Sequence, residues 1–239
     1  MRFVVSLLAV LVLLPVAAAA QELKTDQDKV LYALGAALAG TLQPFNLTPA
    51  ELEIVKSGIT DISLNRKPKI DPAEHMAKIQ ELRDQRAAGV SAAEKKAGES
   101  YVAKVAKEPG ARKLESGVVV IPVKPGTGPS PKATDNVKVH YHGTLTDGTV
   151  FDSSVKRGQP ASFPLNRVIA CWTEGVQQMR VGGKSRLVCP AETAYGDRGA
   201  PPRIKPGATL VFEVELLAIE PPSPPPGATS PPASTTPGK

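Results

Sequence analysis

The stretch VHYHGTLTDGTVFDSS, residues 139–154, contains side chains that could form a binding site. Tyr141 lies on one face of a predicted strand, because side chains alternate along an extended chain. Asp147-Gly148 is typical of a tight hairpin turn, and the returning strand places Phe151 directly before Asp152. An aromatic ring beside an acid suits a pocket better than a core, since a buried carboxylate needs hydrogen-bond partners.

More aromatic side chains follow in the same part of the chain. Six of the ten aromatic residues fall between residues 116 and 220: Tyr141, Phe151, Phe163, Trp172, Tyr195 and Phe212. The only tryptophan, Trp172, comes just before a predicted short helix. Aromatic clusters are often no more than a core, and that alternative stays open here. The two tyrosines and the neighbouring Asp152 favour a pocket, because buried hydroxyls and acids need partners.

The elements that would position these residues follow from the pattern between residues 116 and 220. Strands are predicted at 117–123, 137–145, 185–189 and 208–219, where apolar residues alternate or form short runs. One short helix is indicated by Thr173-Glu174, followed by Val176 and Met179. This pattern predicts an α+β domain, a twisted antiparallel sheet wrapped around a short helix.

Residues 21–115 read as helical. Thr48-Pro49-Ala50-Glu51 and Asp71-Pro72-Ala73-Glu74 each combine a capping residue, a proline and a glutamate that can reach back to the cap. The second motif is predicted to open one long helix over residues 72–107. This helix is thinly apolar, so we expect a solvent-exposed arm.

The first predicted helix mixes Val30, Leu31 and Leu34 with alanines and glycines, which permit close approach of another helix. Residues 21–70 are too few for a robust core of their own. We therefore expect a homodimer in which a second copy completes this core. The alternative is packing against the chain's own C-terminal domain.

The N-terminal residues indicate export. Arg2 precedes an apolar run and the small residues 17–20, which is typical of a secretory signal peptide cleaved after Ala20. An uncleaved anchor is the alternative. We expect a periplasmic protein, with the outer surface or secretion as further destinations, and no stable membrane insertion after cleavage. Residues 221–239 hold 8 of the 24 prolines and are expected to be a disordered tail.

Charge and motifs argue against several classes of function. The formal net charge is +6, and removal of a leader whose only charged side chain is Arg2 leaves +5. No Lys/Arg-rich run is present, so nucleic-acid binding is not predicted. No pattern of a serine hydrolase is present. His140 and His142 share a strand face, but a solvated face is favoured over a metal site.

Cys171 and Cys189 are the only cysteines. In an exported chain they favour a disulfide bond, with two separate free thiols as the alternative.

Five segments together resemble the FK506-binding protein (FKBP) family of prolyl isomerases, in order and with the family's spacing. They are VHYHGTL (139–145), DGTVFDSS (147–154), VIACWTEGVQQM (168–179), AYGDRG (194–199) and ATLVFEVEL (208–216). Residues 21–115 resemble the helical dimerisation segment of periplasmic members of the macrophage infectivity potentiator type, best at Tyr32-Ala33-Leu34-Gly35. The implied order is a signal peptide (1–20), a helical dimerisation domain and linker helix (21–115), an isomerase domain (116–220) and the Pro-rich tail (221–239).

The resemblance implies a shallow aromatic bowl that receives a prolyl ring, with Trp172 as its floor. It assigns catalytic roles to Tyr141, Phe151, Asp152 and Tyr195. It assigns substrate binding to Arg157, Val168, Ile169, Trp172, Ile204 and Phe212. The implied partners are unfolded or partly folded proline-containing polypeptides and the macrocyclic inhibitors FK506 and rapamycin. Ala161 and Ala200 depart from the family pattern, so inhibitor affinity is less determined than isomerase activity.

This chemistry needs no metal or cofactor, and none is predicted. Rotation about a peptide bond meets a barrier of about 18–20 kcal/mol because resonance is lost in the twisted state. An apolar bowl disfavours the charge-separated planar amide, and each ~1.4 kcal/mol of differential stabilisation gives a tenfold rate increase. We therefore predict an exported peptidyl-prolyl cis-trans isomerase that assists folding. The alternatives are a catalytically weak prolyl-binding chaperone and a surface factor for interaction with a host.

Overall fold

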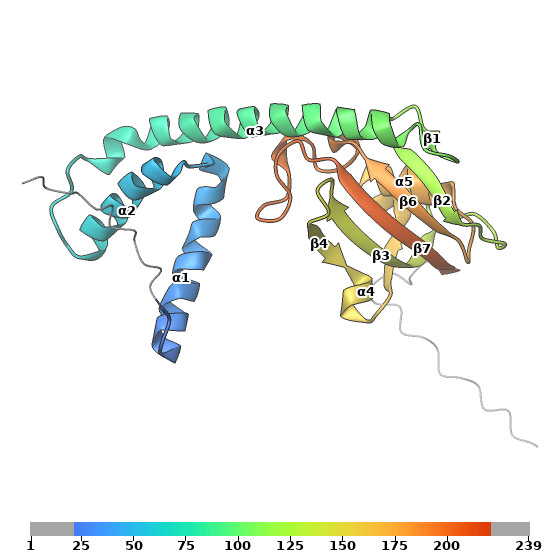
Figure 1. The fold of residues 1–239 in the computed structure, drawn as a ribbon, viewed down its shortest axis with the longest axis horizontal. Coiled ribbons are helices and arrows are strands. Elements are labelled where there is room, and N and C mark those ends of the chain that lie inside the picture. The colour runs from blue at the N-terminus through green and yellow to red at the C-terminus, as the bar shows by residue number, and fades with distance from the viewer. Residues whose placement is uncertain (1–21, 221–239) are drawn as a thin grey trace, which may run out of the picture. The chain divides into compact units, whose positions relative to one another are not determined.

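The computed structural model describes residues 22–220 (Figure 1). The predicted signal peptide and the Pro-rich tail at 221–239 lie outside the described residues. The chain divides into two compact parts, one ending at Ala39 and the other beginning at Gly40. No helix among residues 22–220 is long and apolar enough to cross a membrane.

The N-terminal segment is helical, as predicted, with α1 at Asp26–Leu42 and α2 at Pro49–Ser63. Thr48 caps α2 as predicted: its hydroxyl accepts from the Glu51 amide at 3.3 Å, and the Glu51 carboxylate accepts from the Thr48 amide at 2.8 Å. Neither helix has a buried residue. Most of their large apolar side chains are exposed within the described chain.

The long helix α3 spans Met76–Val105 and begins later than the sequence pattern indicates. Asp71 does act as a cap, accepting from the Ala73 amide at 2.9 Å. However, Pro72–His75 form a separate turn of 3-10 helix. Helix α3 then continues without a break through Gly89.

The remaining chain forms one antiparallel sheet of seven strands with helix α5 against it, which confirms the predicted α+β class (Figure 1). The strand order is β1-β2-β6-β7-β3-β4, with β5 also paired to β3. The strands are β1 (Arg112–Lys113), β2 (Val119–Lys124), β3 (Asn136–Leu145), β4 (Val150–Ser153), β5 (Ala161–Pro164), β6 (Lys184–Cys189) and β7 (Leu210–Glu220). Because β1 pairs with β2, the sheet begins before the expected boundary at residue 116.

Successive residues of three strands face two different helices. On β2, β6 and β7, Val120, Leu187 and Leu210 belong to the main core, which contains α5 (Ala170–Gln177). The residues next to them in the strands, Val119, Ile121, Val188 and Val211, belong to a second core. This core also contains Val102 and Val105 of α3. Since side chains alternate across a strand, α5 and α3 pack on opposite faces of the sheet.

This second core corrects the expectation of a solvent-exposed arm. Ser91, Gly98, Val102 and Val105 are buried on the second half of α3. The few apolar residues of α3 are enough to pack it on the sheet, because Val102 and Val105 lie three residues apart and so share one face of the helix. Small residues then bring the helix close, and a Cβ at Gly98 would overlap the side chain of Thr209.

Helix α5 begins earlier than predicted, so Trp172 lies on the helix rather than before it. Nor is α5 the only short helix of this region, because Ser154–Arg157 form α4 directly after β4. The structure joins Cys171 of α5 to Cys189 at the end of β6 by a disulfide, with Cα atoms 5.5 Å apart.

Candidate active site

The aromatic residues converge on Trp172, each from a different element. The rings of Tyr141 on β3, Phe163 on β5 and Phe212 on β7 lie edge-on to the indole, with centroids 5.3, 5.7 and 5.4 Å away. Phe151 on β4 stacks edge-to-face on Phe212 at 5.5 Å. Such edge-to-face pairs stabilise beyond the burial of their area. The sheet and α5 thus bring together five rings from residues 141 to 212.

The indole N–H of Trp172 is buried and has no hydrogen-bond partner among the described residues. Buried unpaired donors of this kind are uncommon in folded proteins.

Gly143 makes room for two of the rings, which the sequence pattern did not reveal. A Cβ at this position would lie 2.7 Å from Cζ of Phe151 and 3.0 Å from Cε1 of Phe212. Gly143 pairs with Phe212 across β3 and β7 and with Asp152 across β3 and β4. Its hydrogen side chain lets the phenyl rings cross over the strand.

A polar network borders the aromatic cluster. The Tyr141 hydroxyl donates to Oδ2 of Asp152, and Arg157 at the end of α4 forms an ion pair with Oδ1. Arg157 also donates from Nη2 to the Tyr141 hydroxyl oxygen at 2.9 Å. Asp152 is 40% exposed and Arg157 is 51% exposed, so the network lies at the surface edge of the cluster. The structure therefore brings the predicted acid, phenol and guanidinium into direct contact.

The network determines which of these groups are charged. Burial acts to raise the pKa of Asp152, but hydrogen bonds from Tyr141 and Arg157 outweigh it and lower that pKa below its ordinary value. Burial, with the bond to Asp152, raises the pKa of Tyr141. Hydrogen bonds to Tyr141 and Asp152 raise the pKa of Arg157. At neutral pH the network consists of a carboxylate, a neutral phenol and a guanidinium.

Ser154 positions Tyr141 and was not singled out from the sequence. Its fully buried hydroxyl accepts from the Tyr141 amide at 2.7 Å and donates to the Tyr141 carbonyl at 3.2 Å. His140 Nδ1 lies 3.1 Å from the same hydroxyl, and His142 Nδ1 lies 3.0 Å from that of Ser153. No group of metal-binding side chains occurs within residues 22–220.

Three more of the predicted site residues lie in or against the same core. Val168 and Ile169, just before α5, are partly buried against the core, and Ile204 is buried within it. Tyr195 is 42% exposed. Arg203 was missed by sequence reasoning: its Nη1 donates to the Phe151 carbonyl at 2.9 Å, which links its loop to β4. A basic residue between two prolines and an isoleucine carries no signal for such a bond.

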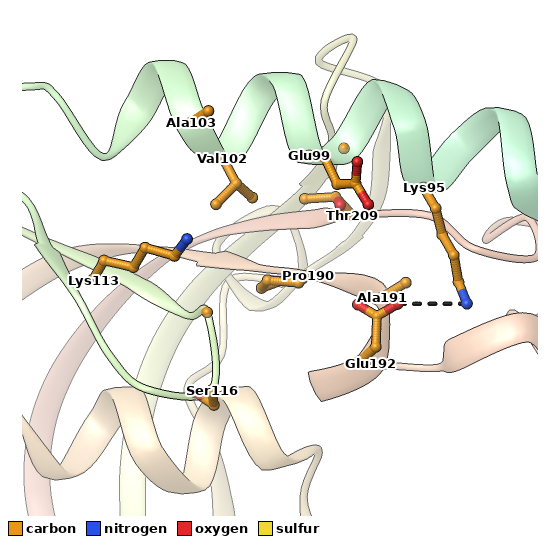
Figure 2. A pocket seen from close by; sticks show the side chains of 12 residues that line it. Lys95, Glu99, Val102, Ala103, Lys113, Ser116, Pro190, Ala191, Glu192 and Thr209 are labelled. Atoms are coloured by element: carbon orange, nitrogen blue, oxygen red, sulfur yellow. Dashed lines mark ion pairs between the residues drawn. The ribbon is translucent and has the colours of Figure 1, made fainter.

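A cavity of about 260 Å³ lies away from the aromatic cluster, beside α3 (Figure 2). Its walls include Val102 and Ala103 of α3 together with Pro190, Ala191 and Thr209. None of the predicted site residues lines it.

Family models match both halves of the chain. Residues 27–119 match the domain amino-terminal to FKBP-type peptidyl-prolyl isomerase, and residues 128–217 match the FKBP-type peptidyl-prolyl cis-trans isomerase domain. The FKBP-type isomerase FkpA of Aeromonas hydrophila is 45% identical over 222 residues, covering 87% of this chain and 82% of that protein. The isomerase Mip of Coxiella burnetii is 33% identical, covering 92% and 98%.

The fold agrees with these relatives. The crystal structure of FkpA from Escherichia coli matches with a TM-score of 0.64 at 35% identity and covers 84% of this chain and 99% of that chain. Sequence and fold therefore lead to one conclusion: this chain belongs to the FKBP-type peptidyl-prolyl cis-trans isomerases and is an enzyme of that kind.

Proposed function

We propose that the aromatic cluster around Trp172 and its polar border are the site at which this isomerase binds and twists an X-Pro bond. The observation that carries the proposal is the network of Tyr141, Asp152 and Arg157 placed at the edge of five converging rings. A purely structural cluster has no need of a partly exposed carboxylate held ionised at its border.

The arrangement suits catalysis by differential binding of the twisted amide. The rings of Phe151, Trp172 and Phe212 offer an apolar surface for the prolyl ring, which removes water from the planar, charge-separated amide. As the bond twists, the carbonyl loses resonance and the nitrogen becomes pyramidal. In our proposal the Tyr195 hydroxyl donates a hydrogen bond to a substrate carbonyl, Asp152 orients the site by holding Tyr141 and Arg157, and no proton is transferred.

Two substitutions test this site. Phe151→Ala removes a ring and Asp152→Ala removes the carboxylate that holds Tyr141 and Arg157. We expect each to lower kcat/KM for an X-Pro peptide by more than about tenfold, the loss of roughly 1.4 kcal/mol of transition-state stabilisation. Isomerisation is followed by a peptide assay at equal folded concentration, with folding checked by circular dichroism.

Matched controls lie outside the cluster. Phe45→Ala removes a ring from the N-terminal segment, and Asp84→Ala removes an exposed carboxylate of α3. Both should isomerise the peptide at the wild-type rate. Folded Phe151→Ala and Asp152→Ala proteins with full activity would disprove the proposed site.

We further propose an exported homodimer that assists the folding of proline-containing proteins. The proposed order is the signal peptide 1–20, the dimerisation domain and linker helix 21–115, the isomerase domain 116–220 and the tail 221–239. Support for the dimer comes from exposed apolar side chains: Val30, Leu31 and Leu34 on α1 and Ile54 and Ile62 on α2 are 56–73% exposed. Apolar surface of this extent on two helices marks an interaction site.

The same exposed side chains favour a second candidate function, the holding of unfolded clients as a chaperone. A client-aggregation assay with Asp152→Ala separates the two functions. Suppression of aggregation by this variant without isomerase activity would separate client holding from catalysis.

A further inference from the structure

The loop from Tyr195 to Thr209, here called the overhanging loop, carries two of the proposed site residues, Tyr195 and Ile204. Its regular structure is limited to one turn of 3-10 helix at Gly196–Arg198 and an isolated bridge between Ala200 and Ile204. Backbone hydrogen bonds within the loop close it on itself, and contacts with other elements hold it against the rest of the domain. These contacts come from β4, from α3 and from the main core, in which Ile204 and Ala208 are buried.

Helix α3 holds the loop through side-chain bonds. The Ser91 hydroxyl donates to Oδ1 of Asp197, and Lys95 Nζ lies 2.7 Å from the same oxygen. A second pair joins Lys205 to Glu94 at 3.0 Å. Lys95 also reaches Glu192 at 3.4 Å, the contact drawn in Figure 2. Hydrogen bonds from Lys95 and then Ser91 lower the pKa of Asp197, so its carboxylate is charged at neutral pH.

The backbones also approach closely at this place. A Cβ on Gly207 would overlap the backbone of Ser91, and Gly207 has a positive φ of 75° that favours glycine. A Cβ on Gly98 would overlap Thr209. Helix α3 is thus fitted to the loop at two separate glycines.

The residue that α3 holds, Asp197, lies close to Tyr195 in the chain. Asp197 lies two residues after Tyr195, and the Gly199 amide donates to the Tyr195 carbonyl at 3.1 Å. The Gly207 amide donates to the Gly196 carbonyl at 2.9 Å and closes the base of the loop. At the far end, Arg203 donates to the Phe151 carbonyl. Tyr195 therefore lies at the closed base of the overhanging loop, and α3 holds this base through its bonds to Asp197.

We infer that Ser91 and Lys95 of the linker helix are positioning residues for the active site, which hold Asp197 and thereby the hydroxyl of Tyr195 in its substrate-binding place. The inference rests on the proposed role of Tyr195 in the isomerase site. It makes α3 part of the catalytic scaffold as well as a connector between domains.

The expected effect is on substrate binding. A loop released from α3 must be ordered again each time a substrate binds, and that entropic cost weakens binding. We expect Ser91→Ala and Lys95→Met each to raise KM for an X-Pro peptide by about three- to tenfold, the cost of ordering one side chain or a little more. The kcat should change by less than about twofold, because a bound substrate restores the geometry.

The test is a double-mutant cycle on the full mature chain. Ser91→Ala and Lys95→Met are measured alone and combined with Tyr195→Phe, which removes the hydroxyl. If α3 acts through this hydroxyl, the α3 variants should raise KM in the wild-type background and leave it unchanged in the Tyr195→Phe background. Lys95→Arg keeps the charge and should restore the wild-type KM.

A matched control comes from another bond at the end of α3. Glu108 pairs with Arg186 of β6, away from the overhanging loop, and Glu108→Gln should leave KM unchanged. Unchanged KM values for Ser91→Ala and Lys95→Met would overturn the inference, as would equal increases with and without the Tyr195 hydroxyl. Normal activity of Tyr195→Phe would instead remove the proposed role of Tyr195, and the inference with it. Phe151→Ala and Asp152→Ala test the site separately.

Discussion

At the scale of single residues, the surroundings of Asp152 stabilise its ionised form. Two donors, Tyr141 and Arg157, outweigh the burial that would otherwise raise its pKa. A carboxylate held in this way accepts from both donors and keeps them in place at the edge of the aromatic cluster. The three pKa shifts of the network, downward for Asp152 and upward for Tyr141 and Arg157, all lead away from neutral pH.

This network predicts a flat pH profile. Because the folded pKa of Asp152 lies below its unfolded value of about 3.9, its bonds stabilise the fold above that value. This stabilisation is lost as the pH falls through the folded pKa. The raised pKa of Tyr141 keeps the phenol neutral on the alkaline side. Isomerisation measured from about pH 5 to about pH 9 should therefore stay constant.

The control for this profile is folding. Fluorescence of Trp172, the only tryptophan, reports unfolding at each pH. A severalfold change in the rate around neutral pH, in protein that remains folded, would mean that a titrating group takes part in catalysis.

Gly143 is a second residue whose importance appears only in three dimensions. Gly143→Ala forces Phe151 and Phe212 to move, and overpacking of this kind costs about 1–3 kcal/mol. We expect a lower free energy of unfolding in denaturant titrations and a lower kcat/KM. Gly58→Ala on α2, where a Cβ meets nothing within 4 Å, is the matched control and should stabilise by about 0.5–1 kcal/mol. Equal effects of the two substitutions would contradict the packing argument.

At the scale of elements, α5 is the piece that brings the floor of the proposed site to the sheet. Gly175 lets it approach β6, since a Cβ there would lie 3.0 Å from both methyl carbons of Leu187. The Cys171–Cys189 bond joins the same two elements across a sequence separation of 18. Helix and strand are therefore held by packing and by a covalent link directly beside Trp172.

Removal of this link should destabilise the domain. Closing a loop of this length restricts the unfolded chain, and the chain-entropy model gives about 3 kcal/mol. We expect Cys171→Ala/Cys189→Ala to lower the free energy of unfolding by roughly that amount, measured by urea titration. Reductant should have the same effect on the wild-type protein and none on the double variant. A reductant-insensitive wild-type protein would contradict the bond.

At the scale of the whole molecule, the sequence pattern and the exposed helices favour a homodimer. Neither α1 nor α2 buries a residue within the described chain, although both carry several large apolar side chains. The prediction is a dimer mass for residues 21–239 in light scattering. Leu31→Lys/Leu34→Lys on α1 should give a monomer with unchanged peptide isomerisation. Glu53→Lys, at an exposed polar position of α2, is the control for the added charge. A wild-type monomer would disprove the dimer.

The sequence by itself determined the class of fold and the set of aromatic residues. The alternation of residues 137–145 and 208–219 defines two strands, and the capping motif at Thr48 defines a helix start. These signals are local, because they depend on neighbours a few residues away. The family motifs added the family to which the isomerase belongs, since its characteristic residues are grouped in short segments.

Only the tertiary structure decided what each local element contacts. The second half of α3 looks too polar to pack, yet Val102 and Val105 meet an apolar face formed by three strands that are distant in sequence. The hydrogen bond from Arg203 to Phe151 and the hold of Ser91 and Lys95 on Asp197 likewise join segments about 50 to 110 residues apart. Contacts of this kind produce no periodic pattern in a sequence, because each depends on how the whole chain folds around its core.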